Sequence, residues 1–328
     1  MAEGGTERGW TGRNRIALLC ATLVLAYAAL VQWAWGWPAI LDGWRQVGFA
    51  KVMLALALLV ATYFVRTHRI QDYFPRETKG CFVRLFRVTQ VHNILNIMLP
   101  FRTGETSFPL LMRSEFGIPL AHGTSALMVL RLLDLHALLA AAGIGLVLQA
   151  GHSAVAWLAW LAFLLAPLAL FPLRGRLLSA GRKRLGPRLD RIVDEIRDGI
   201  PGDRGIFLRA WALTVFNWGV KILVLAWVLG LMGVGPVVAR FGGALGGELS
   251  SVLPVHAPAG VGTYPAGIAA GAAAFGADAS AASLELLARA AINAHLLTVV
   301  AALAGLALGL LILAFAGESE RHGDGRQG

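Results

Sequence analysis

The chain alternates between long apolar stretches and segments rich in basic residues. Several apolar stretches reach the roughly 20 residues that a helix needs to cross a bilayer. They are Ile16–Trp35, Val47–Val65, Thr124–Gln149, Ser153–Pro172, Ile206–Met232 and Leu284–Ala316. This pattern predicts an all-α polytopic membrane protein with about six full transmembrane helices.

Two segments between these stretches are interrupted before they can form a full span. Residues 88–123 begin with an apolar run, Val88–Leu99, that is too short to cross the bilayer and ends at Pro100. Residues 236–276 are rich in glycine and proline and contain no continuous span. Irregular backbone at membrane depth is tolerated only where it lines a cavity or is buried in protein. Both segments are therefore predicted to be re-entrant hairpins, and the order of the spans makes them enter from opposite faces of the membrane.

The two hairpins resemble each other in sequence, which indicates an inverted repeat. Each contains a Leu-Pro pair, then a glycine followed by a proline, then a Phe-Gly pair. The matched positions are Leu99-Pro100, Gly104, Pro109 and Phe116-Gly117 in the first hairpin, and Leu253-Pro254, Gly260, Pro265 and Phe275-Gly276 in the second. The spans that follow carry Arg131, Asp134 and His136 in one half, and Arg289, Asn293 and His295 in the other.

The basic residues predict the orientation and the domain boundaries. The formal net charge is +10, and the basic side chains gather in loops, notably residues 66–87 and 173–204. Such loops stay on the cytoplasmic side, so both termini are predicted to be cytoplasmic. The expected units are a cytoplasmic tail (1–15), a first membrane repeat (16–172), a basic cytoplasmic linker with an amphipathic helix (173–205), a second membrane repeat (206–316) and a cytoplasmic tail (317–328).

The composition argues against a soluble enzyme. Hydrophobic residues make up 57% of the chain, charged residues only 15%, and the mean hydropathy is +0.65. No aromatic-interleaved basic motif accompanies the positive charge, so nucleic acid is not an expected partner. The sequence lacks metal-ligand spacing, a nucleophile elbow and a phosphate-binding loop, so we expect no metal, no cofactor and no enzymatic activity.

Ionisable residues inside spans are costly unless they are paired or hydrated, so they mark the candidate site. The sequence predicts a lipid-headgroup site in which arginines attract an anionic group and glycines let backbone amides approach it. The candidates in the first half are Arg102, Gly104, Glu105, Arg113, Arg131 and Asp134. The candidates in the second half are His256, Gly260, Gly262, Tyr264 and Arg289, with Glu248 as a candidate for proton coupling.

Several of these residues have a structural interpretation beside the functional one. Arg131 and Asp134 are three residues apart on one helix face, where they can form an ion pair that fastens the bundle. Glu105 is expected to pair with Arg102 or another buried arginine rather than with a substrate. Glu248 can equally be a hydrogen-bonded structural residue. Arg289 has Asn293 in place of an acid, so its charge is less compensated and it is the better candidate for a phosphate contact.

Three strings carry a resemblance to a known family. They are Leu99–Glu105, Arg131-x-x-Asp134, and Leu253-Pro254 followed by Pro258–Gly262. They resemble the lysylphosphatidylglycerol synthase transmembrane-region family, also called flippase-like membrane proteins, over roughly residues 10–316. The resemblance implies a bacterial inner-membrane domain that moves a lipid between leaflets, in full-length members an aminoacylated phosphatidylglycerol. The chain ends at Gly328 without a soluble lysyl-transferase domain, so synthesis of that lipid is not expected.

The expected function is therefore a flippase-like transporter in the bacterial inner membrane. Its substrate would be an anionic phospholipid, a glycolipid or a polyprenyl-linked lipid, and the membrane lipid is its expected partner. The alternative is a membrane-embedded lipid-modifying enzyme, or an accessory subunit that binds envelope-lipid biosynthesis proteins. The sequence leaves the lipid, the energy source and the oligomeric state open.

Overall fold

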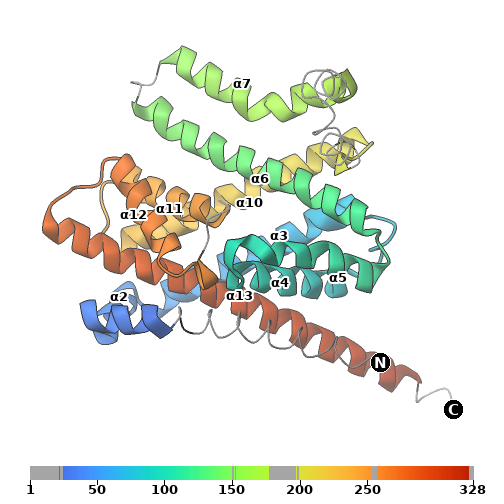
Figure 1. Ribbon diagram of the computed structural model, residues 1–328, viewed down its shortest axis with the longest axis horizontal. Helices are drawn as coiled ribbons and strands as arrows, with labels where there is room; N and C mark the ends of the chain where they lie inside the picture. Colours follow the sequence, from blue (N-terminus) through green and yellow to red (C-terminus); the bar gives the residue numbers. More distant parts are fainter. Residues whose placement is uncertain are drawn as a thin grey trace, which may run out of the picture.

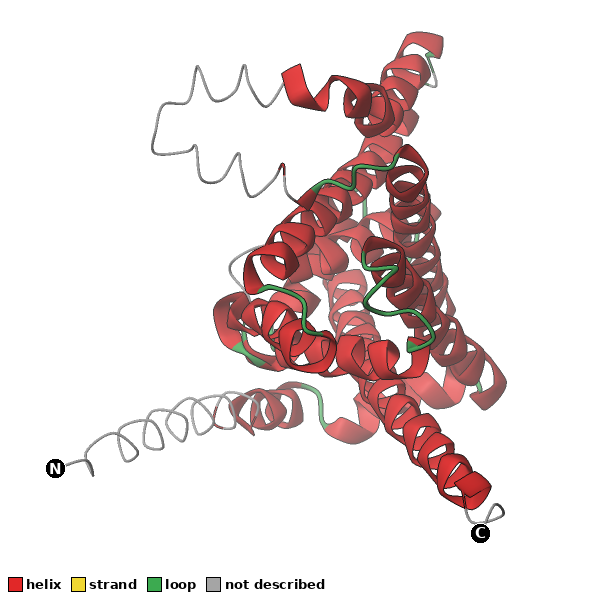
Figure 2. Cartoon of the chain, turned by 90° about the vertical axis from the view of Figure 1, so that its right-hand side faces the viewer, coloured by secondary structure: helices red, strands yellow, loops and turns green. Residues whose placement is uncertain are grey.

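The computed structural model describes residues 25–149, 153–176, 199–252 and 257–324, together with residues 22, 151 and 197, and every regular element in these ranges is a helix (Figure 2). An apolar helix, Leu25–Ala34, precedes the numbered elements. The numbered elements are α2 (Trp37–Val47), α3 (Phe49–Tyr73), α4 (Phe82–Met98), η1 (Pro100–Thr106), α5 (Ser107–Phe116), α6 (Leu120–Gln149), α7 (Ala154–Leu170), η2 (Phe171–Leu173), α10 (Arg204–Leu231), α11 (Val237–Val252), η3 (Pro258–Gly260), α12 (Thr263–Ala274) and α13 (Ala281–Asp324).

Five described helices are long and apolar enough to cross a membrane. They are Phe49–Tyr73, Leu120–Leu148, Ala154–Arg176, Arg204–Leu231 and Ala281–Ile312. Each coincides with a stretch that the hydrophobic pattern predicts, so the all-α polytopic fold is confirmed. The remaining expected span, Ile16–Trp35, falls partly outside the described residues, and so does most of the expected linker helix.

Helix α3 extends further than the hydrophobic pattern predicts. The apolar stretch stops at Val65, and the basic residues that follow were assigned to a cytoplasmic loop. In the structure the helix continues to Tyr73, which places Arg66 and Arg69 on it, and Arg69 is buried. This assignment was wrong because a buried carboxylate partner lets an arginine continue a span, and that partner lies 65 residues away in the sequence.

The two interrupted segments form helical hairpins, α4–η1–α5 and α11–η3–α12, whose turns are similar. Pro100 opens η1, and Phe101 and Arg102 follow with φ of 52° and 56°. Pro258 opens η3, and Ala259 and Gly260 follow with φ of 56° and 70°. The proline that corresponds to Pro100 in geometry is thus Pro258, whereas the sequence comparison matched Pro100 to Pro254, which lies outside the described residues.

The second helix of each hairpin shows the same correspondence. Helix α5 starts at Ser107-Phe108-Pro109 and helix α12 at Thr263-Tyr264-Pro265, so each has proline in its first turn. Both helices are followed by a glycine with positive φ, Gly117 at 69° and Gly276 at 83°. Together with the turn geometry, these matches support the inverted repeat.

The hairpins meet at their turns. In Figure 1 the α11–α12 hairpin lies on one side of the molecule and the α4–α5 hairpin on the other, with α13 passing along both. The Arg102 guanidinium in η1 donates to the backbone carbonyls of Ser251 and Val252 at the end of α11. The turns of the two hairpins therefore lie against each other inside the bundle.

The α11–α12 hairpin is held by direct backbone contact. A Cβ atom at Gly246 would lie 2.2 Å from the carbonyl oxygen of Gly267, and one at Gly271 would lie 2.1 Å from that of Gly242. Between membrane helices, where lipid is as apolar as the side chains, such close packing is a main source of association. Glycine is required at these contacts.

Candidate functional site

A small polar cavity of about 90 Å³ lies where the turns of the two hairpins meet. It is lined from α3, α4, α6, α10, α13 and both arms of the second hairpin, so no single segment of the chain forms it. The lining includes Arg66, Asn93, Asn96, Arg131, Lys221, Glu248, Val252, Gly260 and Tyr264.

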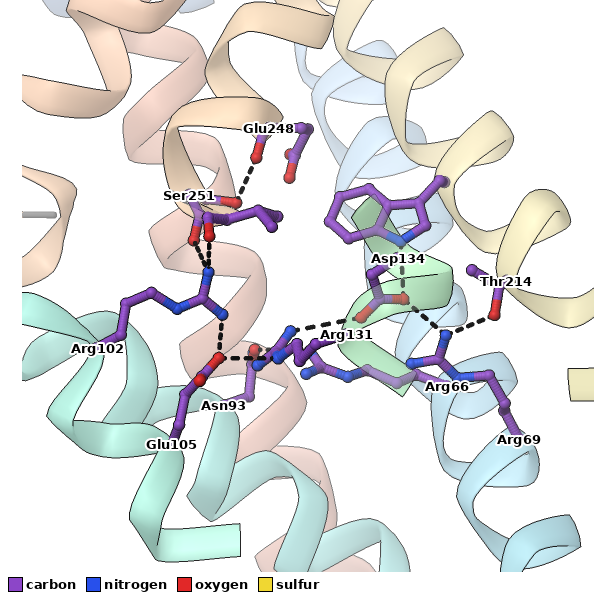
Figure 3. Close-up of polar contacts among 12 residues, drawn as sticks. Arg66, Arg69, Asn93, Arg102, Glu105, Arg131, Asp134, Thr214, Glu248 and Ser251 are labelled. Atoms are coloured by element: carbon purple, nitrogen blue, oxygen red, sulfur yellow. Dashed lines mark hydrogen bonds and ion pairs between the residues drawn. The ribbon is translucent and has the colours of Figure 1, made fainter. Parts of the chain in front are cut away.

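On one side of the cavity, Asp134, which is buried in α6, holds neighbouring helices together. Its Oδ1 accepts hydrogen bonds from Arg69 Nη1 at 2.6 Å and from Trp218 Nε1 at 3.0 Å (Figure 3). Its Oδ2 lies 3.4 Å from Arg131 Nη1. Arg69 Nη1 also donates to Thr214 Oγ1 at 2.6 Å. Asp134 therefore joins α3, α6 and α10, which is the structural role that one interpretation of the sequence assigned to it.

A second carboxylate, Glu105, bridges two arginines. It accepts a hydrogen bond from Arg102 Nη2 and lies 2.9 Å from Arg131 Nε. Because Arg102 also donates to the carbonyls of Ser251 and Val252, the bridge runs from α6 through η1 to the end of α11. The last carbonyls of a helix have no partner within the helix, so the Arg102 guanidinium caps the carboxyl end of α11.

The third carboxylate, Glu248, is completely buried at the other side of the cavity. Lys221 Nζ lies 2.7 Å from its Oε2, and the Tyr264 hydroxyl donates to its Oε1 at 2.8 Å. The carboxylate is thus paired and hydrogen-bonded, as a buried charge must be to persist in a low-dielectric interior.

The charges around the cavity do not cancel. Five basic side chains, those of Arg66, Arg69, Arg102, Arg131 and Lys221, face three carboxylates, those of Glu105, Asp134 and Glu248. The formal excess is two positive charges.

Arg66 accounts for part of this excess. Its Nη1 donates to Asn93 Oδ1 at 3.2 Å, and no carboxylate of the described residues lies within 4.0 Å of it. Two buried donors that belong to cavity-lining residues, Asn93 Nδ2 and Arg131 Nη2, have no hydrogen-bond partner among the described residues. Uncompensated cations beside unpaired donors are what a bound anion would satisfy.

An apolar groove of about 800 Å³, open to the outside of the bundle, lies beside the cavity. It runs between η1–α5 and α6, and its apolar lining includes Phe101, Pro109, Leu110, Leu127, Met128, Leu132 and Leu135. Arg131 and Val252 line both the groove and the cavity, so the two spaces adjoin at these residues. We call Arg131 and Val252 the junction.

The structure brings together seven of the residues that the sequence singled out. Arg102 and Glu105 lie at the junction, Arg131 is part of it, and Asp134 is bound to Arg131. Glu248, Gly260 and Tyr264 line the cavity from the second hairpin. The expected pairing of Glu105 with Arg102 is present.

Other candidates lie away from the cavity. Arg113 is exposed in the last turn of α5, far from the turn of its hairpin. Gly104 is required for packing, because a Cβ atom there would lie 2.3 Å from the Leu95 carbonyl oxygen. Gly262 has φ of 73° and is exposed at the start of α12. His256 lies outside the described residues.

Arg289 also lies in a different pocket from Arg131, although the two residues occupy matched positions in the sequence repeat. It lines a different pocket of about 440 Å³ with Asp42 and Asn293, and it pairs with Glu285 one turn earlier on α13. The charge of Arg289 is therefore compensated by Glu285 on its own helix. The comparison of the two repeats considered only Asn293, the counterpart of Asp134, and did not consider Glu285.

Sequence reasoning missed Arg66, Arg69, Asn93 and Lys221. Arg66 and Arg69 were grouped with the basic loop, but the spacing of three residues from Tyr63 to Arg66 and from Arg66 to Arg69 was a usable signal of one helix face. Lys221 lies near the middle of the apolar span Ile206–Met232, where a charge is a functional or structural hypothesis by default. Among the described residues, no group of three or more His, Cys, Asp or Glu side chains could hold a metal ion.

Comparison with known families agrees with this membrane architecture. The family model described as "Lysylphosphatidylglycerol synthase TM region" matches residues 16–305, which include every residue that lines the cavity and the groove. No curated protein and no solved structure matches the chain significantly.

Proposed function

The chain belongs to the lysylphosphatidylglycerol synthase transmembrane-region family, and on this premise we propose that it moves an anionic lipid between the leaflets of the bacterial inner membrane. The observation that carries the proposal is the junction: an apolar groove open to the outside of the bundle adjoins a polar cavity with excess positive charge. The groove suits a hydrocarbon chain, and the cavity suits a phosphate-bearing headgroup.

The arrangement separates the two parts of a lipid in the way that translocation requires. The headgroup exchanges its water for Arg66, Arg131, Asn93 and backbone around Gly260, while the chain stays in the groove beside the bilayer. Moving a charged group through hydrocarbon without such partners costs many kcal/mol, which is why unassisted lipid exchange is slow. The basic loops place both termini in the cytoplasm in this proposal. The protein acts as a carrier and not as an enzyme, with the lipid as its partner.

The two hairpins, which the sequence predicts to enter from opposite sides, also suit alternating access. The turn of the second hairpin lines the cavity and the turn of the first lines the adjoining groove, so a small shift of either hairpin changes which face of the membrane the cavity meets. Arg66, which lacks a carboxylate partner among the described residues, is the group whose charge a headgroup would compensate most directly.

The test uses the purified chain in liposomes. Tail-labelled fluorescent phosphatidylglycerol and phosphatidic acid should become accessible to an external quencher faster than in empty vesicles. Arg66→Gln should slow this by about tenfold or more, because it removes a charge-assisted contact. The control is Arg209→Gln, since Arg209 is exposed and pairs with Asp72 away from the cavity. Equal rates with and without protein for both anionic lipids would refute the proposal.

A further inference from the structure

The junction is closed by a continuous chain of polar contacts. Glu105 lies 2.9 Å from Arg131 Nε and accepts a hydrogen bond from Arg102, which in turn donates to the Val252 carbonyl. The two ends of this chain, Arg131 and Val252, are the two residues that line both the groove and the cavity. The Arg102–Glu105 pair therefore lies between Arg131 and the end of α11 (Figure 3). If the groove and the cavity are the lipid path, a headgroup must pass this pair.

Glu105 occupies the place that an anionic headgroup would take. A carboxylate and a phosphate offer the same kind of oxygen acceptors, and both bind guanidinium groups through charge-assisted hydrogen bonds. A phosphate arriving along the groove would meet the carboxylate before it reached Arg66 and the unpaired donors of Asn93 and Arg131. Two anions cannot share these guanidinium groups without repulsion.

Glu105 has room to leave. Its side chain is 28% exposed, whereas that of Asp134 is 3% exposed, and Glu105 lines the groove and not the cavity. Its departure would leave Arg102 without a carboxylate partner among the described residues, and Arg131 with Asp134 alone, at 3.4 Å. Only a ligand that brings its own negative charge can replace it there, and a neutral headgroup cannot.

We propose that Glu105 is the selectivity residue of the junction: a tethered carboxylate that a phosphate-bearing lipid headgroup displaces from Arg102 and Arg131, and that neutral lipids leave in place. This inference deepens the proposed function and depends on the groove and cavity being the lipid path. The substrate class it names is a lipid whose phosphate lies next to the attachment of its hydrocarbon chains, so that the phosphate reaches the junction while the chains remain in the groove.

The primary test measures binding and not transport. Tail-labelled phosphatidic acid is titrated into the purified full chain in neutral detergent micelles, with tail-labelled diacylglycerol as the neutral probe. Glu105→Gln removes the competing charge and keeps the shape, so it should tighten phosphatidic acid binding by about tenfold and leave diacylglycerol binding unchanged. Glu105→Asp keeps the charge and should not show this gain.

The matched control lies on the same hairpin. Glu115 in α5 pairs with Arg87 in α4 at 2.8 Å, and its side chain is 29% exposed, close to that of Glu105. Glu115→Gln removes the same charge from the same hairpin away from the junction, so phosphatidic acid binding should stay within about twofold. Unchanged or weaker binding in Glu105→Gln would overturn the inference, as would an equal gain in Glu115→Gln.

A measurement on the unsubstituted chain covers the case in which Glu105→Gln does not fold. A water-soluble carbodiimide with an amine labels free carboxyl groups, and peptide mass spectrometry reports each site. Phosphatidic acid should raise labelling of Glu105 and leave that of Glu115 unchanged, whereas diacylglycerol should change neither. Equal labelling of Glu105 with and without phosphatidic acid would count against displacement.

The two proposals fail separately. If the liposome assay shows no transport but Glu105→Gln still tightens phosphatidic acid binding, the junction is a selective binding site and transport is refuted. If transport occurs and binding to Glu105→Gln is unchanged, transport stands and the role of Glu105 is refuted.

Discussion

Arg69 on α3 lies 2.6 Å from Asp134 on α6, and both side chains are buried. The two residues are 65 positions apart in the sequence, and their contact joins α3 to α6 and holds Asp134 in position for Arg131. The candidate cavity is therefore supported by an ion pair that does not line it. Arg69 and Asp134 line a smaller adjoining space.

Replacing Asp134 should destabilise the protein strongly. Asp134→Asn leaves Arg69 without its buried counter-charge, and breaking such a pair from one side costs about 3–5 kcal/mol. Thermal unfolding in detergent, followed by tryptophan fluorescence, should show a lower midpoint. The exposed Asp42, which lies 4.0 Å from Arg45, provides the control, and Asp42→Asn should shift stability by less than about 0.5 kcal/mol. Equal midpoints for the two variants would contradict this assignment.

The Lys221–Glu248 pair should behave as a coupled unit. Lys221→Met leaves a completely buried carboxylate without its cation, with an expected loss of about 3–5 kcal/mol. Adding Glu248→Gln removes the stranded charge and keeps an acceptor for the Tyr264 hydroxyl, so most of the loss should be recovered. A double-mutant cycle on unfolding midpoints measures the coupling, and strictly additive effects would show that the two residues do not interact.

Lipid transport should be sensitive to a bulky side chain in the groove. Leu132→Trp places a bulky ring in the groove and should reduce lipid transport by about tenfold, because chain entry is blocked and not because the fold changes. Leu139 lies two turns further along the same helix, has similar exposure (45% against 49%) and is not part of the groove lining. Leu139→Trp should transport at the original rate. If both variants transport alike, the groove is not the path of the chain.

The second hairpin should not tolerate a methyl group at its contact. In Gly246→Ala the new Cβ would lie 2.2 Å from the Gly267 carbonyl oxygen, so α11 and α12 must separate, at a cost of about 1–3 kcal/mol. Gly219 in α10 has no heavy atom within 4 Å of a Cβ built there. Gly219→Ala should instead be neutral or raise stability by up to about 1 kcal/mol, since alanine favours the helix. The thermal unfolding midpoint should therefore fall in Gly246→Ala and stay unchanged or rise in Gly219→Ala.

Much of the candidate site could be predicted from local sequence, and the failures have two different causes. Arg102, Glu105 and Arg131 were found because charges next to Gly-Pro breaks or within spans are conspicuous. Arg66 and Arg69 were assigned to a loop because the hydrogen-bond partner of Arg66, Asn93, and the counter-charge of Arg69, Asp134, come from other helices. Arg289 was favoured for the opposite reason, since the comparison of repeats considered Asn293 and overlooked Glu285 on the same helix face.

The sequence by itself determined the class of protein, the positions of the spans and the two interrupted hairpins. These depend on the length of apolar runs and on where glycine and proline break them, and both are local properties that the bilayer constrains strictly. Tertiary structure alone decided which charges neutralise each other, that the net excess gathers in one cavity, and that an apolar groove reaches it at Arg131. Those facts depend on distances between helices far apart in the chain, and Coulomb energy in a low-dielectric interior depends steeply on such distances.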